Sequence, residues 1–385
     1  MKGKPLTLIA ICLVLAVSLT GCWSYHGLNE MAIVLGMAID RDYHTGIYFV
    51  SCEIADLAES SSDTGLTSKV VEAQGRTLLE AVRNAKRRLL TRLYFGNMEV
   101  IILGEDLLRE GEIRDVLNFG MRDIEIRETT HLMIAMGVPA RDIIRLRGLD
   151  QPIVSLELET IVDRDNELIT SSINVELRKA YDALNSPGMS LVLPAIHIVT
   201  NDGEEVAESN GIGLFMKETL VGFISPEDSQ YFLFATDRAH GGMLPMAIGG
   251  DGLMNYTFEI GDSDADIQIH NKEGALSFEL NITADLYLLQ VPEGFDIMKR
   301  ELILELERAA GANLAGSISR VISDVQKQYQ TDVFGFGEVI YKKRLQLWRN
   351  VEDMWMDLFP EIPIDVHCTL TFRNTEFTLT KESFK

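Results

Sequence analysis

A cysteine near the N-terminus stands where it could be covalently modified with lipid. Cys22 ends the run Leu19-Thr20-Gly21-Cys22, whose small residues suit a peptidase that cuts immediately before a cysteine. Lys2, Lys4 and the apolar stretch Leu6–Leu19 precede it, and this stretch is too short to cross roughly 30 Å of hydrocarbon as a helix. The sequence predicts that residues 1–21 are a lipoprotein signal peptide and that Cys22 carries a diacylglycerol thioether and an acylated amine. Two or more acyl chains would anchor the chain stably.

Two other interpretations of this N-terminal segment are an ordinary signal peptide and a buried helix. The lipoprotein signal is favoured because the basic segment, the apolar segment and the cleavage site stand in the required order. No later stretch reaches the roughly 18 uninterrupted apolar residues typical of a membrane-spanning helix. We therefore expect a soluble body tethered to a membrane surface outside the cytoplasm.

The composition is that of a globular protein with an excess of acidic residues. The 385 residues are 46% hydrophobic and 24% charged, which predicts a sizeable core in two or three domains. The formal net charge is −23, and loss of Lys2 and Lys4 with the signal would make it two units more negative. This balance argues against a nucleic-acid partner, because phosphate binding needs an excess of Lys and Arg.

The four cysteines do not predict a disulfide framework. Cys12 would leave with the signal and Cys22 would carry lipid, so only Cys52 and Cys368 remain in the folded body. Both lie in strand-like apolar patterns. We expect two buried thiols that behave as small hydrophobic side chains.

No arrangement of residues predicts catalysis or a bound cofactor. The chain has no Gly-x-Ser-x-Gly nucleophile motif and no glycine-rich phosphate loop ending in Lys-Ser or Lys-Thr. Gly211-Ile212-Gly213 lacks the third glycine of a dinucleotide motif. None of the seven histidines forms the i, i+4 pair that would suit zinc; they are His26, His44, His131, His197, His240, His270 and His367. We predict no catalytic, cofactor or metal residues.

One acidic run has the spacing of a calcium loop. Asp262, Asp264, Asp266 and Glu273 would occupy positions 1, 3, 5 and 12. Position 6 is Ile267, where a glycine must make the sharp turn, and the flanking residues alternate as in strands. A solvated hairpin is therefore favoured over a calcium site.

A basic cluster stands out in this acidic chain: Arg83, Lys86, Arg87, Arg88 and Arg92. Such residues could contact anionic lipid headgroups or an acidic patch on a partner subunit. The favoured interpretation is a solvated helix face with acidic neighbours.

Periodicity in the N-terminal half predicts alternating strands and helices. A capping-box pattern at Thr77-Leu78-Leu79-Glu80 begins one helix, Pro139 a short one, and a polar loop is expected at 59–68. Strands are expected at 31–39, 47–54, 98–103, 132–136 and 191–199, and helices at 77–93, 105–119, 154–162 and 173–184.

The C-terminal half has the clearest periodicities. A hairpin is expected at 211–216 and 220–224, a helix starting at Ser225-Pro226, and a glycine-rich loop at 241–252. Alternation predicts strands over 278–288 and 362–372, separated by helices at 303–325 and 338–358, with Trp348 and Trp355 on the inner side of the second.

These elements predict an α+β protein of several domains, three in our division. Mixed sheets are packed with helices, and the C-terminal domain sets a long helix against an antiparallel sheet. The polar stretch Asn201–Asn210 marks one boundary. The predicted segments are 1–21 (signal), 22–200 (N-terminal domain), 205–272 (middle domain) and 273–385 (C-terminal domain), with 205–385 as a possible single domain.

Several phrases in order along the chain resemble the Ger(x)C family, the lipoprotein subunits of bacterial spore germinant receptors. The resemblance covers essentially the whole mature chain. One departure is that Ser24-Tyr25-His26-Gly27 is nearly neutral where the family commonly carries charges. The phrases are Gly21-Cys22-Trp23, 29–36 (NEMAIVLG), 72–81 (EAQGRTLLEA), 93–101 (LYFGNMEVI), 211–222 (GIGLFMKETLVG) and 332–338 (DVFGFGE), followed by Trp348 and Trp355.

This resemblance implies a three-domain α+β lipoprotein on the outer face of the spore inner membrane. It implies assembly with two integral membrane subunits, one of them transporter-like, and a part in the response to nutrients that ends dormancy. It supplies no catalytic residues. The main alternative is a lipoprotein that binds a small nutrient directly in a pocket, and a third possibility is an enzyme of the cell envelope.

Overall fold

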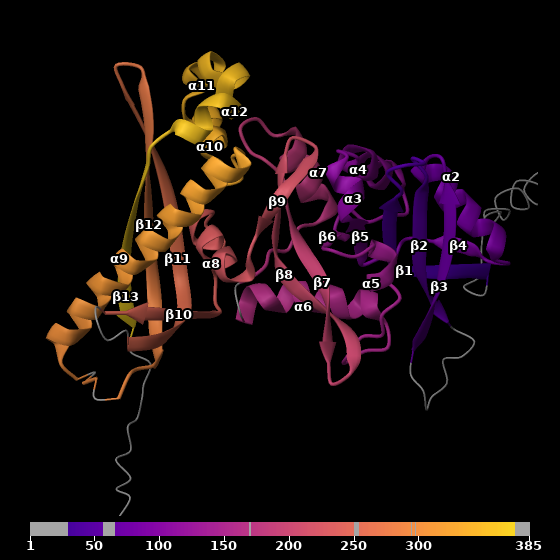
Figure 1. The fold of residues 1–385 in the computed structure, drawn as a ribbon, viewed down its shortest axis with the longest axis horizontal. Helices are drawn as coiled ribbons and strands as arrows, with labels where there is room; N and C mark the ends of the chain where they lie inside the picture. The colour runs from indigo at the N-terminus through magenta and orange to yellow at the C-terminus, as the bar shows by residue number, and fades with distance from the viewer. Residues whose placement is uncertain are drawn as a thin grey trace, which may run out of the picture.

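The computed structural model describes residues 30–56, 66–168, 171–249, 254–293, 295–296 and 298–373. Within these residues the chain forms two sheets with helices packed on them (Figure 1). A nine-stranded sheet follows the order β3-β2-β1-β5-β6-β7-β8-β9, with β4 paired to β1, and a four-stranded sheet follows β10-β11-β12-β13. The mixed α+β architecture is confirmed.

The nine-stranded sheet combines a parallel centre with antiparallel flanks. β1 (Met31–Arg41), β5 (Val100–Gly104), β6 (His131–Ala135) and β7 (Val192–Asn201) pair parallel in that order. The remaining strands are β2 (Tyr48–Asp56), β3 (Thr67–Gly75), β4 (Arg92–Tyr94), β8 (Glu204–Met216) and β9 (Thr219–Ile224).

Both faces of the parallel centre are covered, which explains the unbroken apolar run of β5. Ile101 and Leu103 belong to one hydrophobic cluster, and Val100 and Ile102 to a second on the opposite face. A strand buried on both sides has no polar face to alternate with. The first face is covered by α2 (Leu78–Ala85), α4 (Ile113–Arg122) and α7 (Leu177–Asn185), and the second by α5 (Ala140–Ile143) and α6 (Val154–Leu168).

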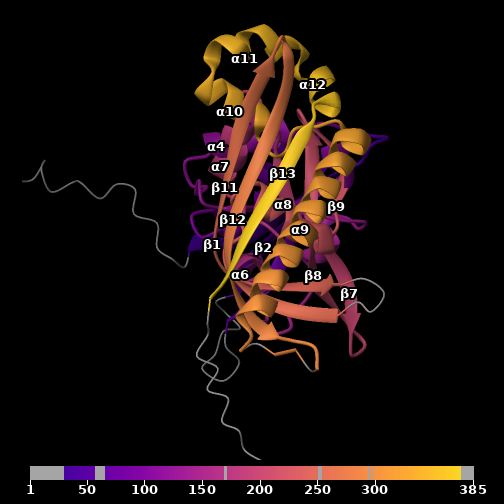
Figure 2. The same cartoon turned by 90° about the vertical axis from the view of Figure 1, so that its left-hand side faces the viewer.

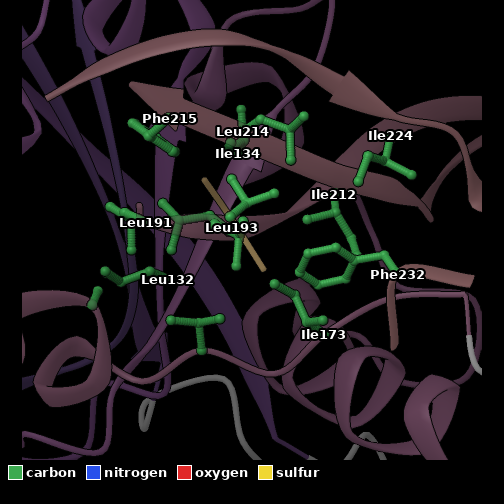
Figure 3. Close-up of a cluster of buried hydrophobic side chains, with 14 of the residues drawn as sticks. Leu132, Ile134, Ile173, Leu191, Leu193, Ile212, Leu214, Phe215, Ile224 and Phe232 are labelled. Carbon is green, nitrogen blue, oxygen red and sulfur yellow. The ribbon is translucent and has the colours of Figure 1, made fainter. Parts of the chain in front are cut away.

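The first cluster continues beneath β7, β8 and β9 to helix α8 (Pro226–Ala235). Figure 3 shows Leu193 and Ile212 of the strands close to Phe232 of α8 and to Ile173, which precedes α7. Ser225 caps α8 by accepting a hydrogen bond from the Asp228 N–H, and Pro226 follows it, as the sequence predicts.

The four-stranded sheet lies at the opposite end of the molecule, with α9 (Arg300–Asp324) along one face (Figures 1 and 2). Its strands are β10 (Met243–Ile248), β11 (Met254–Lys272), β12 (Ala275–Gln290) and β13 (Ile364–Arg373). The predicted long helix against a sheet is confirmed. The sheet is antiparallel from β10 to β12, whereas β13 pairs parallel to β12.

Several predicted helices differ from the structure because the helix ends or is interrupted where the apolar periodicity of the sequence continues. The helix expected over 77–93 ends at Ala85, and that over 105–119 is divided by Gly111 at φ 81° into α3 (Glu105–Arg109) and α4. The helix expected over 173–184 begins only at Leu177. The helix expected over 338–358 is divided, chiefly at Arg344 (φ −143°), into α10 (Phe336–Lys343), α11 (Leu345–Val351) and α12 (Trp355–Leu358).

Short turns complete these helical regions. Lys86–Arg88 (η2), Glu352–Met354 (η4) and Phe359–Glu361 (η5) are 3₁₀ turns, and Val325–Tyr329 (η3) is a π-helical turn that extends α9. Trp348 and Trp355 are both buried, as predicted.

The sequence did not predict β3, β4 or β10 as strands. β3 begins at the end of the loop predicted over 59–68, β4 lies at the end of the helix predicted over 77–93, and β10 lies in the predicted glycine-rich loop. β10 is an edge strand, which is where Pro245 can be accommodated. The first predicted domain boundary, Asn201–Asn210, lies in the β7–β8 hairpin. The second, between residues 272 and 273, lies in the β11–β12 hairpin. Each sheet therefore continues across a predicted boundary. The domain division stays a prediction.

Candidate functional site

The predicted lipidation site lies outside the described residues, as do Trp23 and the rest of residues 1–29. The structure therefore does not test Cys22. Across the described ranges, no helix combines the length and apolar character needed to cross a membrane. β1, the first strand, begins at Met31, nine residues after Cys22 along the sequence.

A cavity of about 570 Å³ opens at the carboxyl ends of β1, β5 and β6. Parallel strands commonly bind ligands at this edge, because the loops that leave the strands converge there. Its lining includes Asp40, Arg41, Phe49, Gly104, Glu105 and Arg141. These residues are widely spaced in the sequence and meet only because β1, β5 and β6 are neighbours.

Asp40 supports the wall of this cavity. Its Oδ1 accepts a hydrogen bond from the Ala140 N–H at 2.7 Å, and its Oδ2 accepts one from the Arg141 N–H at 2.9 Å. Burial raises the pKa of Asp40 above its ordinary value, whereas these two N–H donors lower it. A Cβ on Gly104 would lie 2.4 Å from Asp40 Oδ1, so glycine is needed there. Asp40 therefore fixes the start of α5 and is not free to act as a base.

The two arginines that line the cavity differ in how closely they are already paired with carboxylates. Arg41 pairs with Glu112 and lies over the Tyr48 ring at 5.1 Å. Arg141 lies over the Phe49 ring at 5.6 Å, and its closest carboxylate, that of Asp142, is 4.0 Å away. Arg141 is thus the better placed of the two to bind an anionic group of a small ligand.

The predicted basic cluster is only partly matched by acidic neighbours. Arg92 pairs with Glu125. Arg83, Lys86, Arg87 and Arg88 are exposed on α2 and η2, and no partner for their side chains lies among the described residues. The exposure of these four side chains confirms the predicted solvated helix face, and within the described residues the cluster forms an ion pair with an acidic neighbour at Arg92.

The calcium-like run lies in one strand of a hairpin, and the predicted turn is found only at its end. Asp262, Asp264 and Asp266 are exposed at alternate positions of β11, and Glu273 lies in the turn to β12 at φ 54°. Position 12 would be about 36 Å from position 1 along an extended strand, too far to share one ion. Asp266 instead pairs with Lys343 at 3.0 Å.

Sequence spacing did not predict one cluster of possible metal ligands. His131, Glu159 and Asp163 offer ligand atoms within 4.8 Å of one another. Asn174 already bridges two of them, through a 2.5 Å contact with His131 Nδ1 and a hydrogen bond to Asp163. His131 and Asp163 are thus connected through Asn174 without an ion, so we assign the arrangement a structural role.

Both remaining cysteines are free thiols. Burial raises the pKa of Cys52 and of Cys368 to about 12, so neither is a thiolate at neutral pH. Cys52 is fully buried in the nine-stranded sheet, whereas Cys368 is half-buried in β13.

Asp332 forms a buried polar centre whose role the sequence did not reveal. Its carboxylate accepts hydrogen bonds from the N–H groups of Gly335, Phe336 and Gly337 at 2.7 to 3.2 Å, and from Trp355 Nε1 at 3.2 Å. A Cβ on Gly337 would lie 2.7 Å from the Gly188 oxygen. Residues 332–338 therefore bring parts of the chain that are distant in sequence into close contact.

Comparison with known proteins relates both halves of the chain to spore germination proteins. A family model described as the spore germination protein N-terminal domain matches residues 24–198. A second, described as spore germination B3/GerAC-like, C-terminal, matches residues 210–376.

Relatives from Bacillus subtilis (strain 168) match over nearly their full length. Spore germination protein KC is 22% identical, and the match covers 96% of this chain and 95% of the relative. Spore germination protein B3 is 24% identical, with 93% and 95% covered.

A solved structure described as the crystal structure of the GerBC protein has a similar fold. The TM-score is 0.59 at 20% identity, and the match covers 88% of this chain and 97% of that one. Two consecutive family models, full-length relatives and a shared fold agree with one another, and this chain belongs to the Ger(x)C family of spore germination proteins.

Proposed function

We propose that this protein is the lipid-anchored, non-enzymatic subunit of a spore nutrient germinant receptor. Cys22 would hold it on the outer face of the spore inner membrane, where it acts through assembly and signalling with integral membrane subunits, one of them transporter-like. The observation that carries the proposal is the match of two germination-protein models, in order, to residues 24–198 and 210–376.

The roles of the family-like phrases support a scaffold in preference to an enzyme. Gly75 lets β3 approach α2, because a Cβ there would lie 2.4 Å from the Ala81 nitrogen. Gly222 makes room for the Tyr329 ring, and Asp332 fastens the start of α10. The two glycines allow close contacts between elements, and Asp332 holds a buried turn by hydrogen bonds. These roles are structural.

Replacing Cys22 tests the anchor. In a strain that lacks the native copy, Cys22→Ala should leave the membrane fraction and fail to support germination with nutrients. Cys368→Ala is the matched control, because its half-buried thiol lies in β13, and it should behave as wild type. Normal germination with Cys22→Ala would refute the proposal.

Cross-linking in spore membranes tests the assembly. Wild-type protein solubilised in detergent after cross-linking should bring a transporter-like integral membrane protein with it. Recovery of the lipidated protein without any such subunit would favour a second function.

That second candidate function is direct binding of a small nutrient, and the cavity beside Arg141 favours it. Binding at 100 times the dissociation constant would stabilise the protein by about 2.7 kcal/mol. Amino acids and sugars should then raise the melting temperature of wild type, and Arg141→Gln should weaken the response to those with a carboxylate. The matched control is Arg145→Gln, which alters an exposed arginine paired with Glu72. No shift with any nutrient would exclude this function.

A further inference from the structure

One end of the molecule concentrates positive charge. We call Arg83, Lys86, Arg87 and Arg88 the basic end. They lie on α2 and the following η2 turn, all are exposed, and the described residues provide no carboxylate partner for them. The whole chain has a net charge of −23, so this local excess opposes the charge of the rest of the molecule.

The two most exposed large apolar side chains of the described protein accompany this charge. Leu90 lies just after the basic end and is 110% exposed, relative to the reference value for its residue type, and Ile124 is 99% exposed. The ion pair between Arg92 and Glu125 brings the loop that carries Ile124 against β4, two residues from Leu90. At a membrane interface, lysine and arginine contact the headgroups while neighbouring apolar side chains enter the boundary with the acyl chains, and Leu90 and Ile124 could supply that apolar part here.

The N-terminal segment enters the described structure at the same place. Met31, the first residue of β1, pairs with Arg92 of β4. Cys22 lies eight residues before Glu30, and an extended chain of eight residues spans at most about 28 Å. A lipid on Cys22 would therefore hold the basic end, and not the distant four-stranded sheet, close to the bilayer.

The position of α2 in the whole molecule agrees with this. Figure 1 shows α2 and β4 at one extreme of the long axis, with α9 and the four-stranded sheet at the other. An anionic surface would attract the basic end and repel the acidic remainder, and both effects favour one orientation.

We propose that the basic end docks on the surface of an anionic lipid bilayer, with Leu90 and Ile124 at the level of the headgroups. The proposal rests on the membrane location proposed above and adds an orientation, in which the long axis stands away from the membrane. Lysine and arginine near an anionic leaflet bind phosphate headgroups without a fixed geometry, so the unpaired, separate cations of this surface suit lipid well. A protein partner would more commonly need a continuous apolar patch, whereas Leu90 and Ile124 protrude singly.

Vesicle binding tests the proposal without the anchor. The full-length mature chain with Cys22→Ser should sediment with vesicles of equimolar phosphatidylglycerol and phosphatidylcholine, and not with phosphatidylcholine alone. The variant Arg83→Gln/Lys86→Gln/Arg87→Gln/Arg88→Gln should bind the anionic vesicles at least tenfold more weakly.

The control has the same change in net charge at the far part of the molecule: Lys272→Gln/Arg300→Gln/Lys327→Gln/Arg349→Gln. These four side chains are also exposed, and the control should bind as wild type. Equal weakening in both variants, or no preference of wild type for anionic vesicles, would overturn the proposal. Since no lipid anchor or receptor subunit is present, this result is independent of the proposed receptor function.

A depth measurement keeps the proposal testable if the fourfold variant folds poorly. In a Trp23→Phe background, tryptophan at position 90 (Leu90→Trp) should be quenched by brominated lipid in the anionic vesicles. Tryptophan at position 304 (Leu304→Trp), on exposed α9 at the opposite end, should not be. Quenching at both positions, or at neither, would refute the orientation. Loss of subunit co-isolation by the fourfold variant, with vesicle binding unchanged, would assign the basic end to a protein partner instead.

Discussion

Asp332 is a buried carboxylate whose hydrogen bonds hold the turn before α10 and Trp355 together. It is 1% exposed and accepts four N–H hydrogen bonds, three of them from the glycine-rich turn that leads into α10. Burial raises the pKa of Asp332 to about 6, while the N–H donors of Gly337, Phe336, Gly335 and Trp355 lower it. Burial is the larger effect, so the ionised carboxylate costs stability that its donors only partly recover.

The raised pKa predicts a pH dependence of stability. A carboxyl whose pKa is higher in the folded protein contributes most below its unfolded pKa of 3.8, and this contribution is lost as pH rises through about 6. Between pH 5 and pH 7, wild type should lose about 1 kcal/mol more of its free energy of unfolding than Asp332→Asn. Urea unfolding of both proteins at several pH values measures this difference.

The same variant tests the geometry of these hydrogen bonds. Because the amide of the introduced asparagine would point an N–H₂ group at N–H donors, Asp332→Asn should be less stable than wild type at pH 7 by about 2 kcal/mol. Asp264→Asn, in an exposed position of β11, is the control and should change stability little. Parallel pH profiles of wild type and Asp332→Asn would contradict the assigned pKa shift.

At the scale of elements, α9 offers a comparison of two glycines in one helix. A Cβ on Gly311 would lie 2.8 Å from the Cys368 oxygen, so the helix approaches β13 too closely for a side chain. A Cβ on Gly316 would meet nothing within 4 Å. The two positions share the helical backbone and differ in what lies beside them.

The two alanine substitutions should therefore act in opposite directions. Gly316→Ala should stabilise the protein by about 0.5 to 1 kcal/mol, since alanine is the better helix former. Gly311→Ala should destabilise it by about 1 to 3 kcal/mol, because the sheet must move away from α9. Thermal unfolding of the two variants provides the measurement. Stabilisation by both would show that α9 can move away from β13 at little cost.

The sequence predicted best those elements in which buried side chains recur at a regular spacing along the whole element. Alternation in β12 and β13 and the three-and-four spacing of α9 predicted these elements, and the capping box predicted the start of α2. The breaks were missed because they depend on single backbone angles. Gly111 takes a positive φ, and Arg344 leaves the helical region with no glycine or proline beside it.

The candidate site was less predictable than the fold. Asp40, Gly104 and Arg141 come from three segments, and only the parallel order of β1, β5 and β6 brings them to one cavity. The residues of the basic end lie close together in the sequence, so the cluster could be recognised in this acidic chain. That no carboxylate among the described residues pairs with it could not be predicted, because ion pairs depend on distant segments.

At the scale of the whole molecule, a short stretch after α9 connects the two sheets. The Thr331 hydroxyl can donate to the Phe215 oxygen at 2.7 Å, and the Tyr329 hydroxyl donates to the Phe223 oxygen at 3.2 Å. A Cβ on Gly222 would lie 2.0 Å from the Tyr329 ring, so β9 and the π-helical turn are in close contact. Any movement of one sheet relative to the other must disturb these contacts.

Gly222→Ala should therefore destabilise both parts of the molecule together. Because an added methyl group must displace the Tyr329 ring, we expect a loss of about 1 to 3 kcal/mol. In a Trp23→Phe background, Trp348 and Trp355 report on the C-terminal part, while far-UV circular dichroism reports on all elements. The two probes should shift to the same lower urea concentration. Tyr329→Ala should be destabilising alone, yet the double variant should be more stable than the sum of the two losses predicts, since the clash is removed. A fluorescence midpoint that stays unchanged in Gly222→Ala would show that the sheets unfold independently and that this contact does not couple them.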